Sequence, residues 1–424
     1  MRPKLAIIGG GVSGICAAYL NQSNYDVSLF ERNDYLGGHT NTFVIPSGPD
    51  AGIGIDTGFI VCNNWTYPLF LKFLKRLNVP TQDSDMSFGF YCEKTSFCYA
   101  GTNLNGLFAQ RSNLVSGTFY RMLYDILRFN QEGESFLSSP DPSLNLSDFL
   151  KRANYSKIFI NNYVLPLGAS IWSTPAMQML EFPALTILRF FKNHGLLSIY
   201  RRPQWMTVAN GSHSYIKAFK ENFNGRIILN AKVIGLERPN NANPLISFGN
   251  QEPESFDKII VATHADQALK LLRDPTKEEA EALGPWRYQK NRVVLHTDES
   301  VLPPLKRAWA SWNYVRESLG SEETHLSMTY HMNRLQGLKT KYQYCVSLNR
   351  FKEIPSKQIL KEIDYTHPIY SLSSLRAQSL LAKLNDQLNG STNTYFCGSY
   401  FGYGFHEDAV KAAVDLSEKL RGVL

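Results

Sequence analysis

The chain has 424 residues, of which 43% are hydrophobic and 19% charged, and its formal net charge is +7 at pH 7. This ordinary globular balance suits about two or three domain-sized units and differs from the composition of a disordered tail. The sequence contains no run of about eighteen apolar residues, so it predicts no membrane-spanning helix. No Lys/Arg cluster is dense enough to predict a nucleic-acid partner. The 6 cysteines form no C-x-x-C pair, so the sequence predicts reduced thiols and no metal site.

The first forty or so residues predict a dinucleotide-binding unit. Residues 4–8 are an apolar strand, residues 12–20 a helix of small and apolar side chains, and residues 25–30 a second apolar strand. Glu31 follows this second strand, where an acidic side chain can hold the ribose hydroxyls of an adenosine. Strand, glycine-rich turn, helix, strand and acid follow one another in the order that a βαβ dinucleotide fold requires.

Three glycines, Gly9, Gly11 and Gly14, fill the G-x-G-x-x-G positions between the first strand and the helix. Gly9 permits the tight turn, Gly11 lets a pyrophosphate approach the backbone, and Gly14 lets the helix pack closely on the strand. The helix N-terminus, with Val12 and Ser13, offers free N–H groups and a positive dipole end to the phosphates. These residues are therefore the predicted phosphate-binding turn.

A second glycine pair, Gly37-Gly38, follows the second strand and indicates which dinucleotide is bound. With this pair the chain resembles the FAD-binding family that includes monoamine oxidases and phytoene desaturases. The resemblance implies FAD as the cofactor, with the glycine pair over its diphosphate. His39 occupies a position where the family often has an arginine. The resemblance implies contacts to FAD from Arg32, Gly38, His39, Thr40, Thr57, Gly58 and Phe59.

A glycine- and aromatic-rich turn at residues 394–408 precedes the last predicted helix. The resemblance places this turn under the flavin, with the helix N-terminus directed at the N1/C2=O edge of the ring. Val233 matches the position whose backbone lies beside the adenine. The residues of the turn that the resemblance implies as cofactor contacts are Gly398, Ser399 (where the family usually has an acid), Phe405 and His406.

His406 and Tyr403 are the candidate catalytic residues, because both lie in the flavin turn, where a base could take a proton from the substrate. Glu407 and Asp408 could instead be acids of the first helical turn that favour the helix dipole. A histidine elsewhere is more often a satisfied structural residue than a base. That interpretation applies to His194, His264, His331 and His367.

The predicted fold class is α/β and the architecture is discontinuous. A Rossmann-like FAD-binding domain is expected from residues 1–90, 200–272 and 386–424, and an inserted α+β substrate domain, with an antiparallel sheet plus helices, from residues 91–199 and 273–385. Residues 105–195 have a helical texture, with a loop expected at 165–175. Alternating polar and apolar residues predict strands at 292–296, 308–314, 324–330 and 342–348.

Longer phrases along the chain narrow the resemblance, among them Tyr35-Leu-Gly-Gly-His-Thr40 and Gly402-Tyr-Gly-Phe-His-Glu-Asp408. They are similar to FAD-dependent amine-oxidoreductase-like proteins associated with cyclopropane-fatty-acid-synthase-like methyltransferases. The resemblance implies an FAD-dependent oxidoreductase that transfers hydride from an apolar substrate, such as a modified fatty-acyl chain, to flavin N5. The alternatives are oxidation of a small amine and a redox-silent FAD-binding partner of an acyl-lipid methyltransferase.

The same resemblance implies a small-molecule or lipid substrate, an acyl-lipid methyltransferase as a partner, and a peripheral membrane contact. The N-terminal apolar run contains the phosphate glycines, so its cleavage as a signal peptide would destroy the fold. Together with the unpaired cysteines, this predicts a cytoplasmic protein that touches the membrane at most from its surface.

Overall fold

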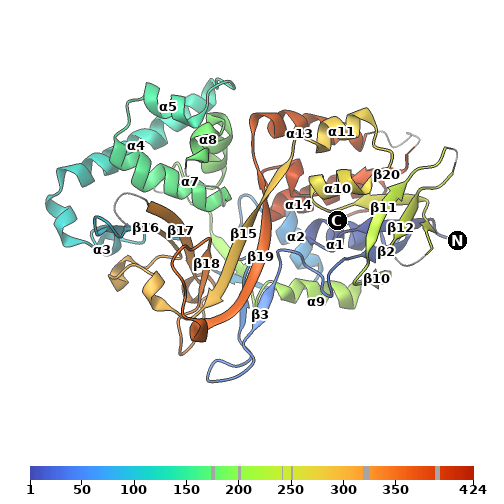
Figure 1. Cartoon of the computed structure of the whole chain (residues 1–424), viewed down its shortest axis with the longest axis horizontal. Helices are drawn as coiled ribbons and strands as arrows, with labels where there is room; N and C mark the ends of the chain where they lie inside the picture. The colour runs from blue at the N-terminus through green and yellow to red at the C-terminus, as the bar shows by residue number, and fades with distance from the viewer. Residues whose placement is uncertain (173–176, 199–201, 241, 250–251, 319–323, 387–391) are drawn as a thin grey trace.

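The computed structural model describes the chain except for residues 173–176, 199–201, 241, 250–251, 319–323 and 387–391. Two lobes lie side by side along the longest axis (Figure 1). The long strands β15 (Arg287–His296) and β19 (Ile359–Ile369) run between them. We call the lobe that contains both chain termini the nucleotide lobe, and the other the substrate lobe.

A parallel five-stranded sheet forms the centre of the nucleotide lobe. Its strands have almost entirely apolar sequences, as expected when both faces of a parallel sheet are covered. The N-terminus, the middle and the C-terminus of the chain all contribute strands, which confirms the Rossmann-like α/β class. In spatial order the strands are β10 (Arg226–Ile228), β2 (Asp26–Phe30), β1 (Lys4–Ile8), β14 (Lys258–Val261) and β20 (Thr394–Phe396).

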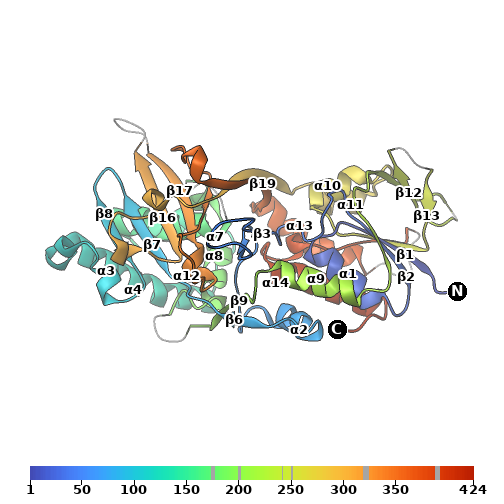
Figure 2. The same ribbon diagram turned by 90° about the horizontal axis from the view of Figure 1, so that it is seen from below.

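Helices α1 (Val12–Asn21) and α14 (His406–Lys419) pack against each other beside this sheet (Figure 2). The hydroxyl of Ser13 donates to the carbonyl of Ala409 at 2.9 Å, which ties the start of α1 to the start of α14. Helix α9 (His213–Asn222) lies near α1 in the same view. A small antiparallel sheet of β11 (Val233–Glu237), β12 (Leu245–Phe248) and β13 (Glu254–Ser255) completes the lobe.

The substrate lobe contains a seven-stranded sheet in the order β19-β15-β18-β17-β16-β7-β8. Its pairs are antiparallel except for β16 with β7. The predicted antiparallel sheet is therefore confirmed, although β16 starts at residue 312 rather than 308 and β19 was missed. Its remaining strands are β7 (Phe88–Cys92), β8 (Phe97–Ala100), β16 (Trp312–Ser318), β17 (Thr324–His331) and β18 (Cys345–Leu348).

A group of helices packs on this sheet and supplies an apolar layer (Figures 1 and 2). The prediction of a loop at 165–175 is wrong for residues 165–172, which form the helix α7 (Leu165–Trp172). Residues 173–175 lie outside the described part. A π-helical turn, Ile160–Val164, directly precedes α7 and changes the hydrogen-bond pattern ahead of Pro166. The other main helices are α4 (Gly117–Ser138), α5 (Leu146–Arg152) and α8 (Ala184–Asn193).

Two details of the structure differ from the predicted domain boundaries. The boundary between residues 90 and 91 cuts β7, which pairs with β16 and β8 along its length. Helices α11 (Lys277–Leu283) and α13 (Leu372–Leu384), predicted in the substrate domain, pack on each other, and α13 also contacts β20. Both helices therefore lie with the nucleotide lobe (Figure 1). Helix texture alone does not reveal the lobe to which a surface helix attaches.

Candidate cofactor and active site

The first glycine turn is held by contacts that only glycine allows. Gly9 has φ +112°, and a Cβ there would lie 2.6 Å from the carbonyl oxygen of Ala262. A Cβ on Gly14 would lie 1.9 Å from the carbonyl oxygen of Gly9, so α1 packs on the turn backbone to backbone. A Cβ on Gly11 would meet nothing within 4 Å. The turn is therefore tight on two sides and open at Gly11, where a phosphate is predicted to approach.

Glu31 is buried at the end of β2 beside this turn. Its Oε2 accepts a hydrogen bond from the Gly10 amide at 2.7 Å, and its Oε1 accepts one from the Asn33 amide at 2.9 Å. An ionised carboxylate has about four acceptor positions, so both oxygens retain capacity for ribose hydroxyls. Arg32, the next predicted contact, is exposed.

The second glycine turn lies directly on the first. The Gly37 amide donates to the Gly10 carbonyl at 2.8 Å, and a Cβ on Gly38 would lie 3.5 Å from the Cα of Gly11. The carbonyl of His39 accepts from the Phe59 amide at 2.8 Å, and this brings residues 57–59 to the same place. The structure thus gathers the predicted contacts from both turns at the N-terminus of α1.

His39 carries an unsatisfied polar atom at this point. Its Nε2 is buried and has no hydrogen-bond partner, and burial lowers the pKa of the imidazole to about 4. Buried polar atoms without partners are rare, so each one calls for an explanation. The open space at Gly11 and the free Nε2 of His39 together fit a bound dinucleotide with its diphosphate between the two turns.

His406, a candidate catalytic residue, is the first residue of α14 and lies in a network of hydroxyls. Its Nε2 is 3.0 Å from Oγ1 of Thr40 and 3.2 Å from the hydroxyl of Tyr215. Its ring stacks on Phe59, with centroids 3.7 Å apart. Burial lowers its pKa to about 3, so the ring is neutral. These contacts favour a positioning role for His406, and Tyr215 is a member of the network that sequence analysis missed.

The two acids after His406 act as helix caps. The carboxylate of Glu407 accepts from the amides of Leu69 and Phe70, at 3.0 and 2.9 Å, at the start of α2 (Pro68–Arg76). Asp408 accepts from the amide of Phe405 at 2.9 Å, at the start of its own helix. The interpretation of both as acids that favour a helix N-terminus is therefore correct, with Glu407 serving a different helix from its own.

The aromatic residues of the flavin turn contact the substrate lobe. The ring of Phe405 stacks on Phe190 of α8, with centroids 4.9 Å apart. Tyr403 is half-buried and interacts with Arg189, while burial raises the pKa of its hydroxyl. The turn itself is closed by the Ser399 carbonyl, which accepts from the amides of Gly402 and Gly404. In this way the turn presents aromatic rings toward α8.

The remaining predicted contacts lie at the two ends of the site. Val233 pairs with Phe248 across the small sheet, and the Phe248 ring lies 5.4 Å from that of Phe30, next to Glu31. Gly398 follows β20, and a Cβ there would lie 2.5 Å from the ring of Tyr400. Val233 is thus near the ribose side that Glu31 marks, and Gly398 leads into the flavin turn. The individual cofactor contacts stay predictions.

The family model for flavin containing amine oxidoreductase matches residues 12–364. The chain therefore belongs to the flavin-containing amine oxidoreductase family, and FAD is its cofactor. In the described part of the chain, no helix is long and apolar enough to cross a bilayer. The same residues contain no group of three or more His, Cys, Asp and Glu side chains that could hold a metal ion.

Two curated relatives share parts of the sequence. An FAD-dependent oxidoreductase of Apiospora sacchari, dpasF, is 25% identical over 291 residues, which are 66% of this chain and 57% of the relative. The 4,4'-diaponeurosporene oxygenase of Staphylococcus haemolyticus is 45% identical over 56 residues, 13% of this chain and 10% of the relative. The match therefore spans little more than half the length of the Apiospora protein.

Two solved structures share the fold over nearly the whole chain. Cyclohexylamine oxidase from Brevibacterium oxydans superposes with a TM-score of 0.70 at 15% identity, covering 99% of this chain and 100% of that one. A CLA-producing fatty acid isomerase from P. acnes gives a TM-score of 0.67 at 14% identity, covering 98% of both chains. At this identity the likeness concerns the fold alone.

Proposed function

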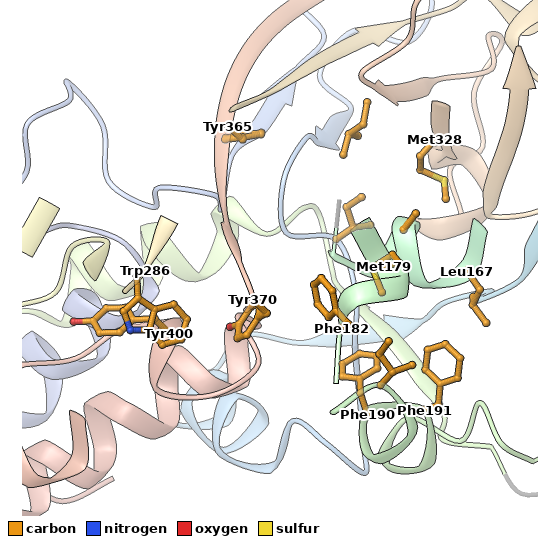
Figure 3. Close-up of a cluster of buried hydrophobic side chains, with 14 of the residues drawn as sticks. Leu167, Met179, Phe182, Phe190, Phe191, Trp286, Met328, Tyr365, Tyr370 and Tyr400 are labelled. Carbon is orange, nitrogen blue, oxygen red and sulfur yellow. The ribbon is translucent and has the colours of Figure 1, made fainter. Parts of the chain in front are cut away.

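We propose that the chain is an FAD-dependent oxidoreductase that takes a hydride from an apolar substrate, a fatty-acyl chain or a modified form of one. Bound FAD supplies the two-electron acceptor for such a reaction. The observation that carries the proposal is the apolar contact between the flavin turn and α8, where Phe405 stacks on Phe190. Around it gather the buried side chains of Phe182, Phe190, Phe191, Met179 and Leu167 (Figure 3).

The carboxylates of the described residues favour an acyl substrate over a cationic amine. A buried ammonium group needs a charged or hydrogen-bonding partner. Glu407 and Asp408, next to the flavin turn, are already bonded to backbone amides. The buried carboxylates also have protein partners, and none belongs to α7 or α8: Glu31, Asp50, Asp56, Asp125, Glu279, Asp298 and Glu317.

The residues of the turn have separate tasks in this proposal. Phe190 and Phe405 exclude water from the reacting carbon and orient an apolar chain. Tyr403 stays protonated at neutral pH, because burial raises its pKa, so its hydroxyl donates a hydrogen bond. His406 holds Thr40 and Tyr215 in place through Nε2 and thereby positions the loop that carries the second glycine turn.

A visible absorption spectrum tests the proposal. Purified protein is made anaerobic and mixed with bacterial phospholipids, and separately with simple primary amines. Bleaching of the flavin band by lipid supports an acyl oxidoreductase. Bleaching by amines alone would make the chain an amine oxidase, like the cyclohexylamine oxidase of Brevibacterium whose fold it shares. If neither lipid nor amine reduces the flavin, the result would favour a redox-silent partner of an acyl-lipid methyltransferase.

If the acyl substrate is dissolved in a bilayer, the protein has to contact the bilayer to reach the substrate. One face of the substrate lobe suits such a contact. Six large apolar side chains are exposed on α3 (Leu104–Leu107), the short helix Arg111–Val115 and α4: Leu104, Leu114, Val115, Tyr120, Tyr124 and Leu127. The charged residues from residue 94 to residue 127 are Lys94, Arg111, Arg121 and Asp125, of which Asp125 is buried and ion-paired with Arg121. Exposed apolar side chains among cations are typical of surfaces that bind anionic lipid.

We propose that this face touches an anionic bilayer. Sedimentation with vesicles measures the contact, and Leu114→Ser together with Val115→Ser should reduce binding to phosphatidylglycerol vesicles severalfold. Ile234→Ser, at an exposed apolar residue of the small sheet, is the matched control. Equal binding of all variants, or equal binding to uncharged vesicles, would contradict the proposal. A methyltransferase partner stays a prediction from the resemblance.

A further inference from the structure

Three histidine rings, which we call the imidazole cluster, lie beside the second glycine turn. They are His39, His264 after β14, and His367 on β19. The centroid of the His39 ring is 5.1 Å from that of His367 and 6.2 Å from that of His264. Three segments far apart in the sequence thus meet at one point, and the family resemblance assigned a cofactor role only to His39.

In the described part of the chain, the side chains around the cluster are rings, an amide and the Thr366 hydroxyl, without an anion. The ring of Tyr365 stacks on His39 at 4.8 Å, and that of Tyr288 stacks on His264 at 4.4 Å. Asn291 bonds Nδ1 of His367 through its Nδ2, at 2.6 Å. Among the described residues, no carboxylate forms a hydrogen bond or ion pair with any of the three imidazoles.

Charged and titratable groups on the neighbouring elements act on the cluster from further away. Burial most of all, then His39 and Arg32, disfavours a proton on His264. Burial, then His39 and His264, disfavours one on His367. On α14, His406 is held neutral in part by His39. On α10 (Ala265–Leu271) and β4 (Gly54–Asp56), Asp266 and Asp56 act on Tyr288 and Tyr365 respectively, one ring removed from the imidazoles. The residues that the structure describes therefore supply no direct counter-charge to the cluster.

The hydrogen bonds of His39 determine which nitrogen faces the open side. The Thr366 backbone forms a hydrogen bond that raises the pKa of this imidazole, as a carbonyl acceptor does. Because Nε2 has no partner, Nδ1 makes this bond and carries the proton of the neutral ring. Nε2 is then a bare acceptor. It can donate to an anion only after it gains a second proton, which makes the ring a cation.

The backbone places His39 where an anion is predicted. Its neighbour Gly38 lies against Gly11, the open position of the phosphate turn. A diphosphate there is an anion in a poorly solvated place, and such a charge raises the pKa of an adjacent imidazole. A protonated His39 would supply a cation beside this anion.

We propose that His39 is the protonatable counter-ion of the FAD diphosphate, so that FAD binding is coupled to the uptake of one proton at Nε2 of this ring. The proton comes from solvent, one N–H bond forms, and no electron is transferred. His264 and His367 are positioning residues that fix the His39 ring without adding a charge. The inference depends on FAD as the cofactor and is independent of the substrate class.

The test measures FAD affinity against pH. Holoprotein is diluted at a series of pH values, and flavin fluorescence reports the released FAD. In the free protein the pKa of His39 is about 4, and in the complex it is raised. Between these two values the dissociation constant should rise about tenfold per pH unit, and it should be flat below and above them.

The variants separate His39 from other groups. His39→Gln should bind FAD more weakly with no pH dependence in this range, and His39→Arg should supply the cation at every pH and likewise remove the dependence. His325→Gln, on β17, is the control that should retain it. FAD added to stripped protein in weak buffer should also take up one proton in the wild type and none in His39→Gln.

Two results would overturn the inference. One is a wild-type dissociation constant that does not change with pH, and the other is a pH dependence that survives in both His39 variants. If FAD still binds in those cases, the proposed oxidoreductase function is unaffected. Conversely, if FAD affinity follows pH as expected but lipid does not reduce the flavin, the proposed function fails and this inference stands.

Discussion

The glycine turns around α1 and the apolar layer between α7, α8 and the seven-stranded sheet are determined in different ways. At Gly9 and Gly14, a single added carbon would lie within 2.6 Å of a carbonyl oxygen, so the residue type is fixed by the backbone. In the apolar layer, Phe182 and Phe191 are fixed only by the volume and shape they fill. Cores of this kind accept other apolar residues of similar volume. The glycine turns are thus determined residue by residue, and the apolar layer by the volume that its side chains fill together.

The largest effect should come from the first glycine turn. There, substitution of one glycine should change the stability of the protein, and substitution of another should change FAD binding. Gly14→Ala places its Cβ 1.9 Å from the Gly9 carbonyl oxygen, whereas Gly11→Ala meets no protein atom within 4 Å. We expect Gly14→Ala to lower the free energy of unfolding by about 3 kcal/mol or more. Gly11→Ala should leave the stability of the FAD-free protein unchanged and weaken FAD binding at least tenfold. Thermal unfolding and flavin titration measure the two quantities, and equal behaviour of the variants would contradict the comparison.

The second effect belongs to the apolar layer. Phe190→Ala removes a buried ring that stacks on Phe405 and on His194, and should cost about 3–5 kcal/mol of stability. Phe190→Leu fills much of the same volume and should cost less than about 1.5 kcal/mol. Urea unfolding measures both. A cost for Phe190→Leu as large as that of Phe190→Ala would mean that this layer is as strictly determined as the glycine turns.

The difference between residues fixed by backbone geometry and residues fixed by the volume they fill also decides what could be predicted from the sequence. The nucleotide lobe was predictable because Gly9, Gly11, Gly14 and Glu31 have spacings that one backbone geometry imposes. The sequence left open whether Glu407 acts on the substrate or is an acid of a helical first turn. The Leu69 amide that donates to it lies 338 residues away in the chain. No local pattern contains such a pairing.

Other features could not be predicted because their signals were weak or absent. Strand β19 is half-exposed and carries charged residues and Pro368, so its alternation is poor. Small residues and Pro166 made α7 resemble a loop. His39 was predicted as a cofactor contact, but its contacts with His264 and His367 exist only once β19 lies beside the residues that follow β14, so these two histidines looked like ordinary structural residues.

The third effect is a loss of stability in acid that both lobes share. Burial lowers the pKa of His194 to about 4 and that of His406 to about 3. Unfolded histidine titrates near 6.5, so below that pH the unfolded chain binds protons that the folded chain does not, and stability falls as the pH falls. Each such ring should cost about 2 kcal/mol between pH 7 and pH 5.

His194→Gln should therefore lose less stability between these two pH values than the wild type, in urea unfolding without FAD. His325→Gln, at the β17 histidine that bonds the Asn349 carbonyl, is the control and should match the wild type. If His194→Gln had the wild-type slope, the ring would already be charged in the folded state, contrary to its burial, which outweighs the opposite effect of its hydrogen bond with the Phe190 carbonyl.

The smallest effect tests how the flavin turn is joined to the rest of the nucleotide lobe. Glu407→Gln retains one acceptor for the amides of Leu69 and Phe70 but removes the negative charge from the N-terminus of α2. The expected cost is about 1 kcal/mol of stability. Glu418→Gln, at an exposed position of α14, the helix that carries Glu407, should not change the stability measurably. Because α2 and α14 start at the same place, the variant should also weaken FAD binding slightly. A variant that weakened FAD binding without any change in stability would instead place Glu407 against the cofactor.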